Sequence, residues 1–305
     1  MSGRTKRILY RILDTVLWLA AALGVFLMLL LIASKEKEAP QAAEFIACGA
    51  FVLCILLKIP VLLHELGHLL FGLIAGMKPV SFRVSFLGGS TAGAIEMVPK
   101  NPKKVRGRFL CFALGGGIFN LLVGAVLLAL FLSLPYHPAL LFCGMFSSFS
   151  LYEGVRALIP AELPAGKTDG GVICGILRQS PEEMVMLRVL EVQGILCKGS
   201  FSAVPRRALF ETPVVREDLP AFHALLSLRM QYLLALCDEK GAAEQLSRLK
   251  NLEEYFSEGE KKELERYERY FSGDFTARKE PLFGLSELEK TLEKRCARNA
   301  REMET

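Results

Sequence analysis

The sequence predicts an all-α polytopic membrane protein of about four transmembrane helices, followed by a soluble α-helical domain. Two observations carry this prediction: 52% of the 305 residues are hydrophobic, and the excess is uneven along the chain. Long apolar runs fill the chain up to about residue 160, whereas charged, helix-periodic sequence fills it from about residue 180. We therefore expect a membrane-embedded domain over 1–180 and a cytosolic helical domain over 181–305.

Four apolar runs approach or exceed the ~20 residues that a helix needs to span a bilayer. They cover residues 12–33, 45–75, 109–134 and 138–158. The first run follows the basic stretch RTKRILYR, is longer than the apolar core of a signal peptide and is not followed by an A-x-A site. We therefore expect a retained membrane helix at the N-terminus rather than a cleaved signal.

The loop between the second and third runs carries a strand pattern and a basic cluster. Alternating apolar residues over 80–86 and the segment AIEMV, separated by GGSTAG, predict a small β-hairpin in a cytosolic or re-entrant loop. The cluster KNPKKVRGR that follows places this loop on the cytosolic side, as the basic N-terminus does for the first helix. Four spans then put both termini in the cytosol of a bacterial-type plasma membrane.

Charge and cysteine usage exclude several classes of protein. The net charge of +5 does not indicate nucleic-acid binding, because the basic surplus lies beside the apolar runs. The eight cysteines are scattered singly, and the absence of a CxxC pair supports neither a zinc knuckle nor a redox motif. The partners we expect from composition are therefore the lipid bilayer and no nucleic acid.

The second apolar run contains His64, Glu65 and His68, in VLLHELGHLLFGLIAG. Titratable groups are costly in hydrocarbon and usually have a function there. Histidines four residues apart lie on one helix face and can bind one ion, while Glu65 can reach a water held by that ion. This is the HExxH arrangement of zinc metalloproteases, and it predicts one Zn²⁺ per chain. Two packed histidines and a snorkelling glutamate are the alternative, which three titratable groups inside one span disfavour.

A catalytic zinc takes a third protein ligand, and it has to come from a distant element. No acid lies between Glu65 and Glu96, whereas LIPAELPAGKTDGG breaks the fourth helix within 159–178. Broken backbone at membrane depth is tolerated only beside protein or a water-filled cavity. By the expected topology this break lies near the cytosolic end, level with HELGH. We therefore predict Asp169 as the third ligand, with Glu96 and Glu162 as the fallback candidates.

These motifs resemble those of the site-2 protease family of intramembrane zinc metalloproteases. The resemblance covers roughly residues 45–178 and rests on HELGH at 64–68, GGGIFN at 115–120 and LIPAELPAGKTDGG at 158–171. It implies His64, His68 and Asp169 as zinc ligands and Glu65 as the catalytic acid/base. The implied activity is hydrolysis of membrane-anchored protein or peptide substrates near the cytosolic face, by attack of a zinc-held water.

Asn120 has two interpretations that the sequence leaves open. It either donates a hydrogen bond to the substrate or oxyanion, or it joins helices in a glycine-rich tract where backbones approach closely. Catalytic use is the role we assign to it alongside Glu65.

An inactive, protease-derived membrane scaffold is the second interpretation of the whole chain. It is motivated by Ala157, which stands where the family often has an asparagine, and by the large C-terminal domain. We expect that domain to begin with a helix capped by Ser180 and to contain a helical pair over 218–256 that turns at Gly241. Such pairs suggest tetratricopeptide-like repeats and a protein partner. A metal transporter or sensor is a third interpretation, with only one intramembrane cluster to support it.

Overall fold

The structure, a computed structural model of the chain, describes residues 3–33, 59–84, 93–134, 138–163, 166–199, 201–236, 238–256 and 258–271. Residues 45–58 of the predicted second span therefore lie outside the described part. The chain divides into two compact units, which we call the N-terminal unit (1–97 with 107–177) and the C-terminal unit (98–106 with 178–305). The division near residue 178 is close to the domain boundary expected at 180, but residues 98–106 fold with the C-terminal unit.

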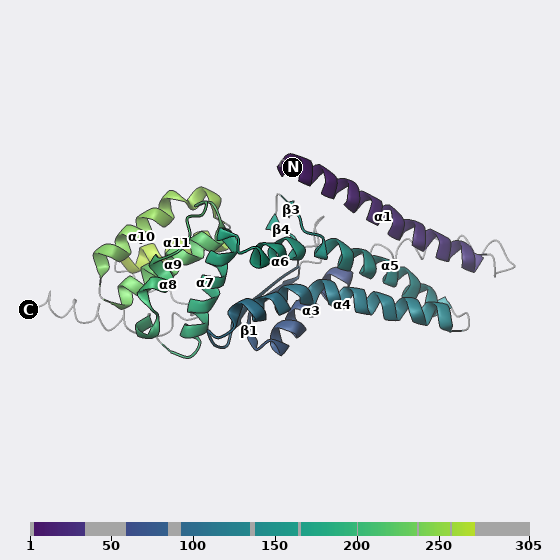
Figure 1. Cartoon of the computed structure of the whole chain (residues 1–305), viewed down its shortest axis with the longest axis horizontal. Coiled ribbons are helices and arrows are strands. Elements are labelled where there is room, and N and C mark those ends of the chain that lie inside the picture. Colours follow the sequence, from purple (N-terminus) through teal and green to yellow (C-terminus); the bar gives the residue numbers. More distant parts are fainter. Residues whose placement is uncertain are drawn as a thin grey trace, which may run out of the picture. The chain divides into compact units, whose positions relative to one another are not determined.

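Helices make up most of the N-terminal unit, as the sequence predicts (Figure 1). They are α1 (Gly3–Ala33), α3 (Ile59–Ile74), α4 (Val105–Ser133), α5 (Pro138–Leu158) and α6 (Asp169–Leu177). A two-stranded sheet of β1 (Met77–Val84) and β2 (Gly93–Pro99) follows α3 and confirms the small sheet expected there. A second sheet, β3 (Glu162–Leu163) with β4 (Gly166–Lys167), lies between α5 and α6.

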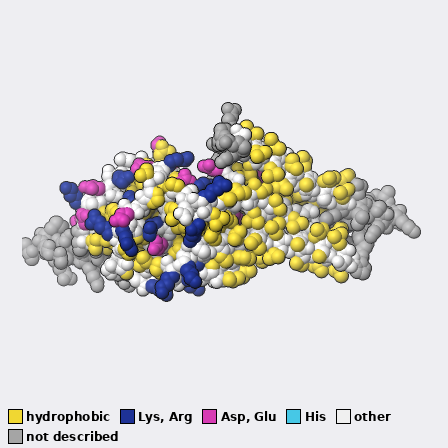
Figure 2. All heavy atoms as spheres, viewed as in Figure 1, with side chains coloured by type: hydrophobic (Ala, Val, Ile, Leu, Met, Phe, Trp, Pro, Cys, Tyr) yellow, Lys and Arg dark blue, Asp and Glu magenta, His cyan; other side chains and the backbone are white. Residues whose placement is uncertain are grey.

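Two of the described helices are long and apolar enough to cross a membrane. These segments are Ile8–Leu27 of α1 and Val105–Ser133 of α4, whereas α3 is a shorter apolar helix. Only 17% and 28% of the apolar windows of α1 and α4 are buried within the protein. On the face drawn in Figure 2 the N-terminal unit shows a nearly continuous hydrophobic surface, whereas charged side chains cover the C-terminal unit. The predicted total of four spans stays a prediction.

Helices α4 and α5 pack antiparallel through glycines. A Cβ at Gly117 would meet the side chain of Leu158, and one at Gly124 would meet Leu151, so contacts advance along α4 as they recede along α5. Close approach of this kind is typical of small residues in helix pairs within membranes. Contacts between α3 and α4 follow the same rule, because Gly67 faces Gly115 while the earlier Pro60 reaches the later Asn120.

Contacts join α1 to α5, also in antiparallel order, because Gly24 lies against Ser148 while the earlier Asp14 contacts the later Tyr152. The Tyr152 hydroxyl donates to Oδ1 of Asp14 at 2.9 Å, and Nε of Arg156 lies 3.2 Å from the same oxygen. Arg156 also pairs with Glu153 of its own helix at 3.0 Å, so the arginine is shared between α5 and α1. The first turns of α1 and α4 and the last turns of α3 and α5 therefore lie at one end of the unit, which we call the basic end.

The small sheet packs against the end of α3. Gly76 ends this helix with a φ of +77°, a conformation that favours glycine, and Arg108 donates to its carbonyl at 3.2 Å. Met77, Ile95 and Met97 form a buried cluster against α3 and the first turns of α4. The sheet is therefore fixed beside the helix that carries the HELGH motif.

The C-terminal unit is a helical array with its own core. Its elements are α7 (Pro181–Leu196), η1 (Phe201–Ala203), α8 (Arg206–Phe210), α9 (Pro220–Ala235), α10 (Glu239–Asn251), η2 (Glu253–Tyr255) and α11 (Glu258–Phe271). Leu225, Leu226 and Met230 of α9 are fully buried, so α9 is the central helix of this core. Most of the apolar side chains of the unit point inward, as in a soluble domain.

Two details of this unit differ from the sequence prediction. Ser180 is the N-cap residue of α7, as expected, but its hydroxyl contacts the Glu183 carboxylate instead of a backbone N–H. The predicted turn at Gly241 is wrong, because Gly241 lies in the first turn of α10. Asp238 caps that helix, and its carboxylate accepts from the backbone N–H of Gly241 at 2.9 Å. An aspartate N-cap therefore starts the helix before the glycine.

Candidate metal centre

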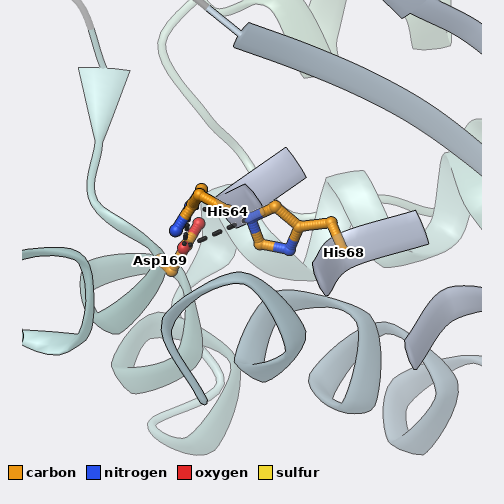
Figure 3. Close-up of side chains that lie close together, drawn as sticks. All are labelled: His64, His68 and Asp169. Atoms are coloured by element: carbon orange, nitrogen blue, oxygen red, sulfur yellow. Dashed lines mark hydrogen bonds and ion pairs between the residues drawn. The ribbon is translucent and has the colours of Figure 1, made fainter. Parts of the chain in front are cut away.

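Three side chains that are distant in the sequence converge in the N-terminal unit. His64 and His68 come from α3, and Asp169 is the first residue of α6 (Figure 3). The two Nε2 atoms lie 3.0 Å apart, and Oδ2 of Asp169 lies 3.0 Å from that of His64 and 3.3 Å from that of His68. Within the described part of the chain this is the one group of three such side chains that could hold a metal ion.

The period of α3 places the two imidazoles together. Residues four apart lie one above the other on a helix, and the rings of His64 and His68 meet edge to face with centroids 4.6 Å apart. Gly67, between them, lets this part of α3 approach α4. A Cβ at Gly67 would lie 2.5 Å from the Gly115 carbonyl oxygen, closer than real Cβ atoms come to other atoms.

Gly116 of α4 lies directly beneath the two rings. A Cβ at this position would lie 2.6 Å from Nε2 of His68 and 2.7 Å from Nε2 of His64. The backbone of α4 therefore contacts the edge of the cluster where the ring nitrogens converge. Any larger residue would push the imidazoles away from Asp169.

A backbone carbonyl of α4 sets the tautomer of His68. Nδ1 of this ring lies 2.8 Å from the Phe112 carbonyl oxygen, which can only accept a hydrogen bond. The proton of the neutral ring is therefore on Nδ1, and Nε2 presents its lone pair to the cluster. Histidines that bind metals are oriented by the same kind of hydrogen bond on the other nitrogen.

Thr168 positions Asp169, which follows it directly. Its hydroxyl donates to the Ile159 carbonyl at 2.7 Å and accepts from the backbone N–H groups of Ala161 and Gly171 at 3.0 and 3.1 Å. The first partner lies at the end of α5, the second precedes β3 and the third belongs to the first turn of α6. Thr168 is thus the N-cap of α6 and also closes the loop behind it.

The loop before α6 is a compact hairpin rather than a simple break. Glu162 pairs with Lys167 and Leu163 with Gly166 in the antiparallel β3–β4 sheet. Gly170 then allows the start of α6 to lie against the Leu158 carbonyl, where a Cβ would clash. The prolines and glycines indicate a helix break, and the structure shows that this break folds the chain back onto α5.

The three converging atoms suit a divalent metal ion. Neither contact of Asp169 Oδ2 with a ring nitrogen has hydrogen-bond geometry, so this buried oxygen has no hydrogen-bond donor. The buried Nδ1 of His64 has no hydrogen-bond partner either. A proton between the two Nε2 atoms would leave the carboxylate oxygen unsatisfied. In a tetrahedral zinc site with ligands at 2.0–2.1 Å, ligand atoms are about 3.3 Å apart. The observed separations of 3.0, 3.0 and 3.3 Å are close to that spacing.

The cluster is shielded but not sealed. The side chains of His64 and Asp169 are 15% and 23% exposed, whereas that of His68 is 7% exposed. Two imidazoles and one carboxylate make up a three-ligand set of the kind that leaves a further position open in catalytic metal sites. A water molecule or a small ligand would occupy that further position.

Glu65 lies beside the cluster rather than in it. It is 7% exposed, and its carboxylate accepts a hydrogen bond from the backbone N–H of Ile95 in β2. One residue beyond His64, it is turned by about 100° around the helix axis, so it does not point where the imidazoles point. The small sheet thus fixes a carboxylate next to the candidate metal position, where it can exchange a proton with water.

Asn120 is fully buried between three helices. Its amide nitrogen donates to the Pro60 carbonyl of α3 at 3.1 Å, and the Ser150 hydroxyl of α5 donates to its backbone carbonyl at 3.0 Å. These contacts favour the helix-joining interpretation, and a catalytic role for Asn120 stays a prediction.

The structure therefore brings together the three predicted ligands and leaves the fallback candidates outside. Glu96 and Glu162 are exposed and do not belong to the cluster. The roles of His64, His68 and Asp169 as ligands and of Glu65 as catalyst remain predictions. Sequence reasoning missed the capping residue Thr168, although a threonine before Asp-Gly-Gly is an N-cap pattern.

Comparisons with protein-family models, with curated proteins and with solved structures give no match for this chain. In the part of the chain that the structure describes, the fold and the site define a mostly helical protein with two helices able to cross a membrane and a His-His-Asp group able to hold a metal ion.

Proposed function

We propose that the chain is an intramembrane zinc metalloprotease that hydrolyses peptide bonds of membrane-anchored proteins or peptides near the cytosolic face. The observation that carries the proposal is the convergence of His64, His68 and Asp169 with Glu65 held beside them. A purely structural cluster would not need a buried glutamate beside three converging ligand atoms. The HExxH motif and the resemblance to site-2 proteases point to the same chemistry.

One Zn²⁺ is the ion we assign to the three ligands. Two imidazoles and a carboxylate match zinc better than calcium or magnesium, which prefer oxygen ligands. When bound, zinc supplies a Lewis acid that makes water a nucleophile at neutral pH and polarises a carbonyl. His64, His68 and Asp169 hold the ion, and the Phe112 carbonyl keeps the His68 lone pair directed at it.

Glu65 performs the proton transfers of the reaction. Its carboxylate accepts a proton from the attacking water and returns it to the amine that leaves when the peptide C–N bond breaks. The hydrogen bond from Ile95 holds the side chain in place for both steps. Burial of the glutamate at 7% exposure excludes competing bulk water from it.

The packing order of the helices supports the orientation that we propose in the membrane. The basic end holds the first turns of α1 and α4, and Lys and Arg are enriched on the cytosolic side of membrane proteins. With α1, a second span ending in α3, α4 and α5 as four spans, both termini lie in the cytosol of a bacterial-type plasma membrane. The cluster faces residues 112–116 of α4, about 10–16 Å along the axis from its start at 1.5 Å per residue.

This depth suits substrates that enter the site from the membrane. The centre lies within the apolar length of α4 but nearer its basic end, so water from the cytosol has a short path. A membrane-anchored protein or peptide can present a bond there that a soluble protein cannot. We also propose that the C-terminal unit binds a protein partner.

Substitution Glu65→Gln tests the proposal. The full chain is reconstituted with a set of single-span membrane proteins, and cleavage is followed by mass spectrometry while zinc is measured in the same samples. The proposal predicts that Glu65→Gln retains zinc and loses cleavage by at least a hundredfold. The matched control is Glu162→Gln, an exposed glutamate of the same unit, which retains both. Cleavage that is equal in wild type and Glu65→Gln would contradict the role of Glu65, and cleavage that is absent from both would leave the scaffold interpretation.

A further inference from the structure

A short basic segment joins the two units. Residues 98–108, VPKNPKKVRGR, carry five Lys or Arg side chains and no acid, and we call them the basic segment. They connect β2, beside the candidate metal centre, to α4. Nothing in the proposed chemistry uses them.

Residues 98–106 of the basic segment are part of the folded C-terminal unit rather than a free loop. A Cβ at Gly194 of α7 would lie 3.0–3.1 Å from Asn101 and Pro102, so the segment lies directly on that helix. The backbone N–H of Lys103 donates to Oδ1 of Asn101 at 3.1 Å, which makes a tight turn. Val98 and Val105 are 5% and 7% exposed. The lysines between these anchors therefore project from an ordered surface.

Three of these cations have no acidic counterpart in the described part of the chain. Lys100, Lys103 and Lys104 are exposed, and none of them forms an ion pair with another residue that the structure describes. Three like charges within five residues repel one another, so an external anion would stabilise their placement. The surface is thus complementary to a negatively charged partner.

The position of the segment along α4 identifies that partner. The apolar part of α4 starts at Phe109, and Lys104 precedes it by about 7.5 Å at 1.5 Å per residue. The headgroup layer of a bilayer is about 5–8 Å thick on each side. When α4 crosses the membrane, the basic segment lies at the depth of the lipid phosphates.

We propose that the basic segment is a docking surface for anionic lipid headgroups and holds the C-terminal unit against the cytosolic leaflet. Each basic residue near an anionic membrane surface strengthens binding by about fivefold at moderate salt. The proposal concerns Lys100, Lys103 and Lys104 and requires only that α4 spans the membrane. It does not depend on hydrolysis by the metal centre, so either proposal can fail without the other.

Native mass spectrometry of the full chain in detergent tests the proposal, with phosphatidylglycerol and phosphatidylcholine as the probes. The variant is K100Q/K103Q/K104Q, and the matched control is K240Q/K250Q/K262Q, which removes three exposed lysines from α10 and α11. Phosphatidylglycerol should bind the wild type and the control alike, and the variant on the order of a hundredfold more weakly. Phosphatidylcholine binding should be the same in all three proteins.

A salt titration of the wild type and two competitors complete the test. The preference of the wild type for phosphatidylglycerol should fall as ionic strength rises. This measurement does not depend on the folding of any variant. Equal phosphatidylglycerol affinity in wild type and variant overturns the proposal. Displacement of the lipid by millimolar inorganic phosphate would assign the surface to a free anion, and displacement by an equal concentration of duplex DNA would assign it to nucleic acid; both results contradict a lipid surface.

Discussion

Thr168 has every hydrogen-bonding site of its hydroxyl in use, with partners on three segments of the chain. Valine has almost the same shape but neither donates nor accepts a hydrogen bond. Its introduction would leave the N–H groups of Ala161 and Gly171 and the Ile159 carbonyl without this partner. Each buried backbone group left unsatisfied costs about 1–3 kcal/mol, so the first turn of α6 would move, and Asp169 with it.

Thr168→Val should therefore weaken metal binding although Thr168 is not itself a predicted metal ligand. We expect a loss on the order of tenfold in zinc affinity, as for other residues that orient metal ligands. Thr168→Ser keeps the hydroxyl and should retain affinity within a few-fold. The measurement is competition with a chromophoric chelator in detergent. Equal affinity of the serine and valine variants would show that the cap does not position Asp169.

At the scale of residues, the sequence predicts those site residues that side-chain type and spacing identify. His64 and His68 follow from a four-residue interval, and Asp169 follows from a helix break in an apolar context. The hydrogen bond from His68 to the Phe112 carbonyl has no such signal, because every residue has a carbonyl. Which carbonyl faces the ring depends on how α3 packs on α4, and this is visible only in three dimensions.

Helices α3 and α4 lie so close together at the cluster that there is no room for a side chain at two positions of α4, and both are glycines. Gly116 contacts the ring nitrogens, and Gly115 contacts the Gly67 carbonyl. By contrast, nothing lies within 4 Å of a Cβ built at Gly107, in the first turn of the same helix. The two positions separate the effect of close packing from the general effect of glycine in a helix.

Gly116→Ala should destabilise the N-terminal unit by about 1–3 kcal/mol, because the new methyl group overlaps the imidazoles. It should also abolish zinc binding at micromolar concentrations. Gly107→Ala should leave zinc binding unchanged and raise stability by about 0.5–1 kcal/mol, since alanine favours a helix. Zinc content and thermal unfolding of both variants check this expectation. Zinc bound normally by Gly116→Ala would contradict the assigned geometry.

A chain of polar groups links α9 to α11 inside the C-terminal unit. The Tyr267 hydroxyl donates to Oε1 of Glu263 at 3.0 Å and accepts from the Gln231 amide. Burial raises the pKa of Glu263 above its ordinary value near 4.5. The folded state therefore binds this proton more tightly than the unfolded state, and its contribution to stability is lost as pH rises through the raised pKa.

Glu263→Gln should remove that pH dependence, because glutamine keeps an acceptor for Tyr267 and carries no charge. We expect its unfolding midpoint to exceed that of the wild type at pH 8 and the difference to shrink toward pH 4.5. Far-UV circular dichroism of the full chain across this range measures it. Glu265→Gln, at an exposed position of α11, is the control. A difference that does not vary with pH would refute the assignment.

At the scale of elements, the sequence predicts the long apolar helices well, but it does not predict the short hairpins and turns that connect helices. The runs at 109–134 and 138–158 correspond to α4 and α5 within a few residues. The β3–β4 hairpin was not expected, because strands of two residues carry no alternation to detect. The turn predicted at Gly241 failed because the Asp238 cap outweighed the glycine.

The whole molecule combines an apolar helical unit with a charged helical unit. Residues 98–106 of the basic segment interrupt the N-terminal unit in sequence but pack with the C-terminal unit. Composition predicts the two regions, since apolar and charged residues are segregated along the chain. It does not predict that residues 98–106 leave the N-terminal unit, because that depends on the contact with Gly194. The candidate metal centre lies entirely within the N-terminal unit, so it forms without residues of the other.

The zinc content of the purified full chain tests the central claim most directly. Wild type, Asp169→Ala and the control Glu162→Ala are compared by elemental analysis after reconstitution with zinc and removal of excess metal. We expect about one zinc per chain in the wild type and in Glu162→Ala, and at least a tenfold weaker affinity in Asp169→Ala. A wild type that binds no zinc, or an Asp169→Ala variant that binds it as tightly as the wild type, would contradict a zinc site made of His64, His68 and Asp169.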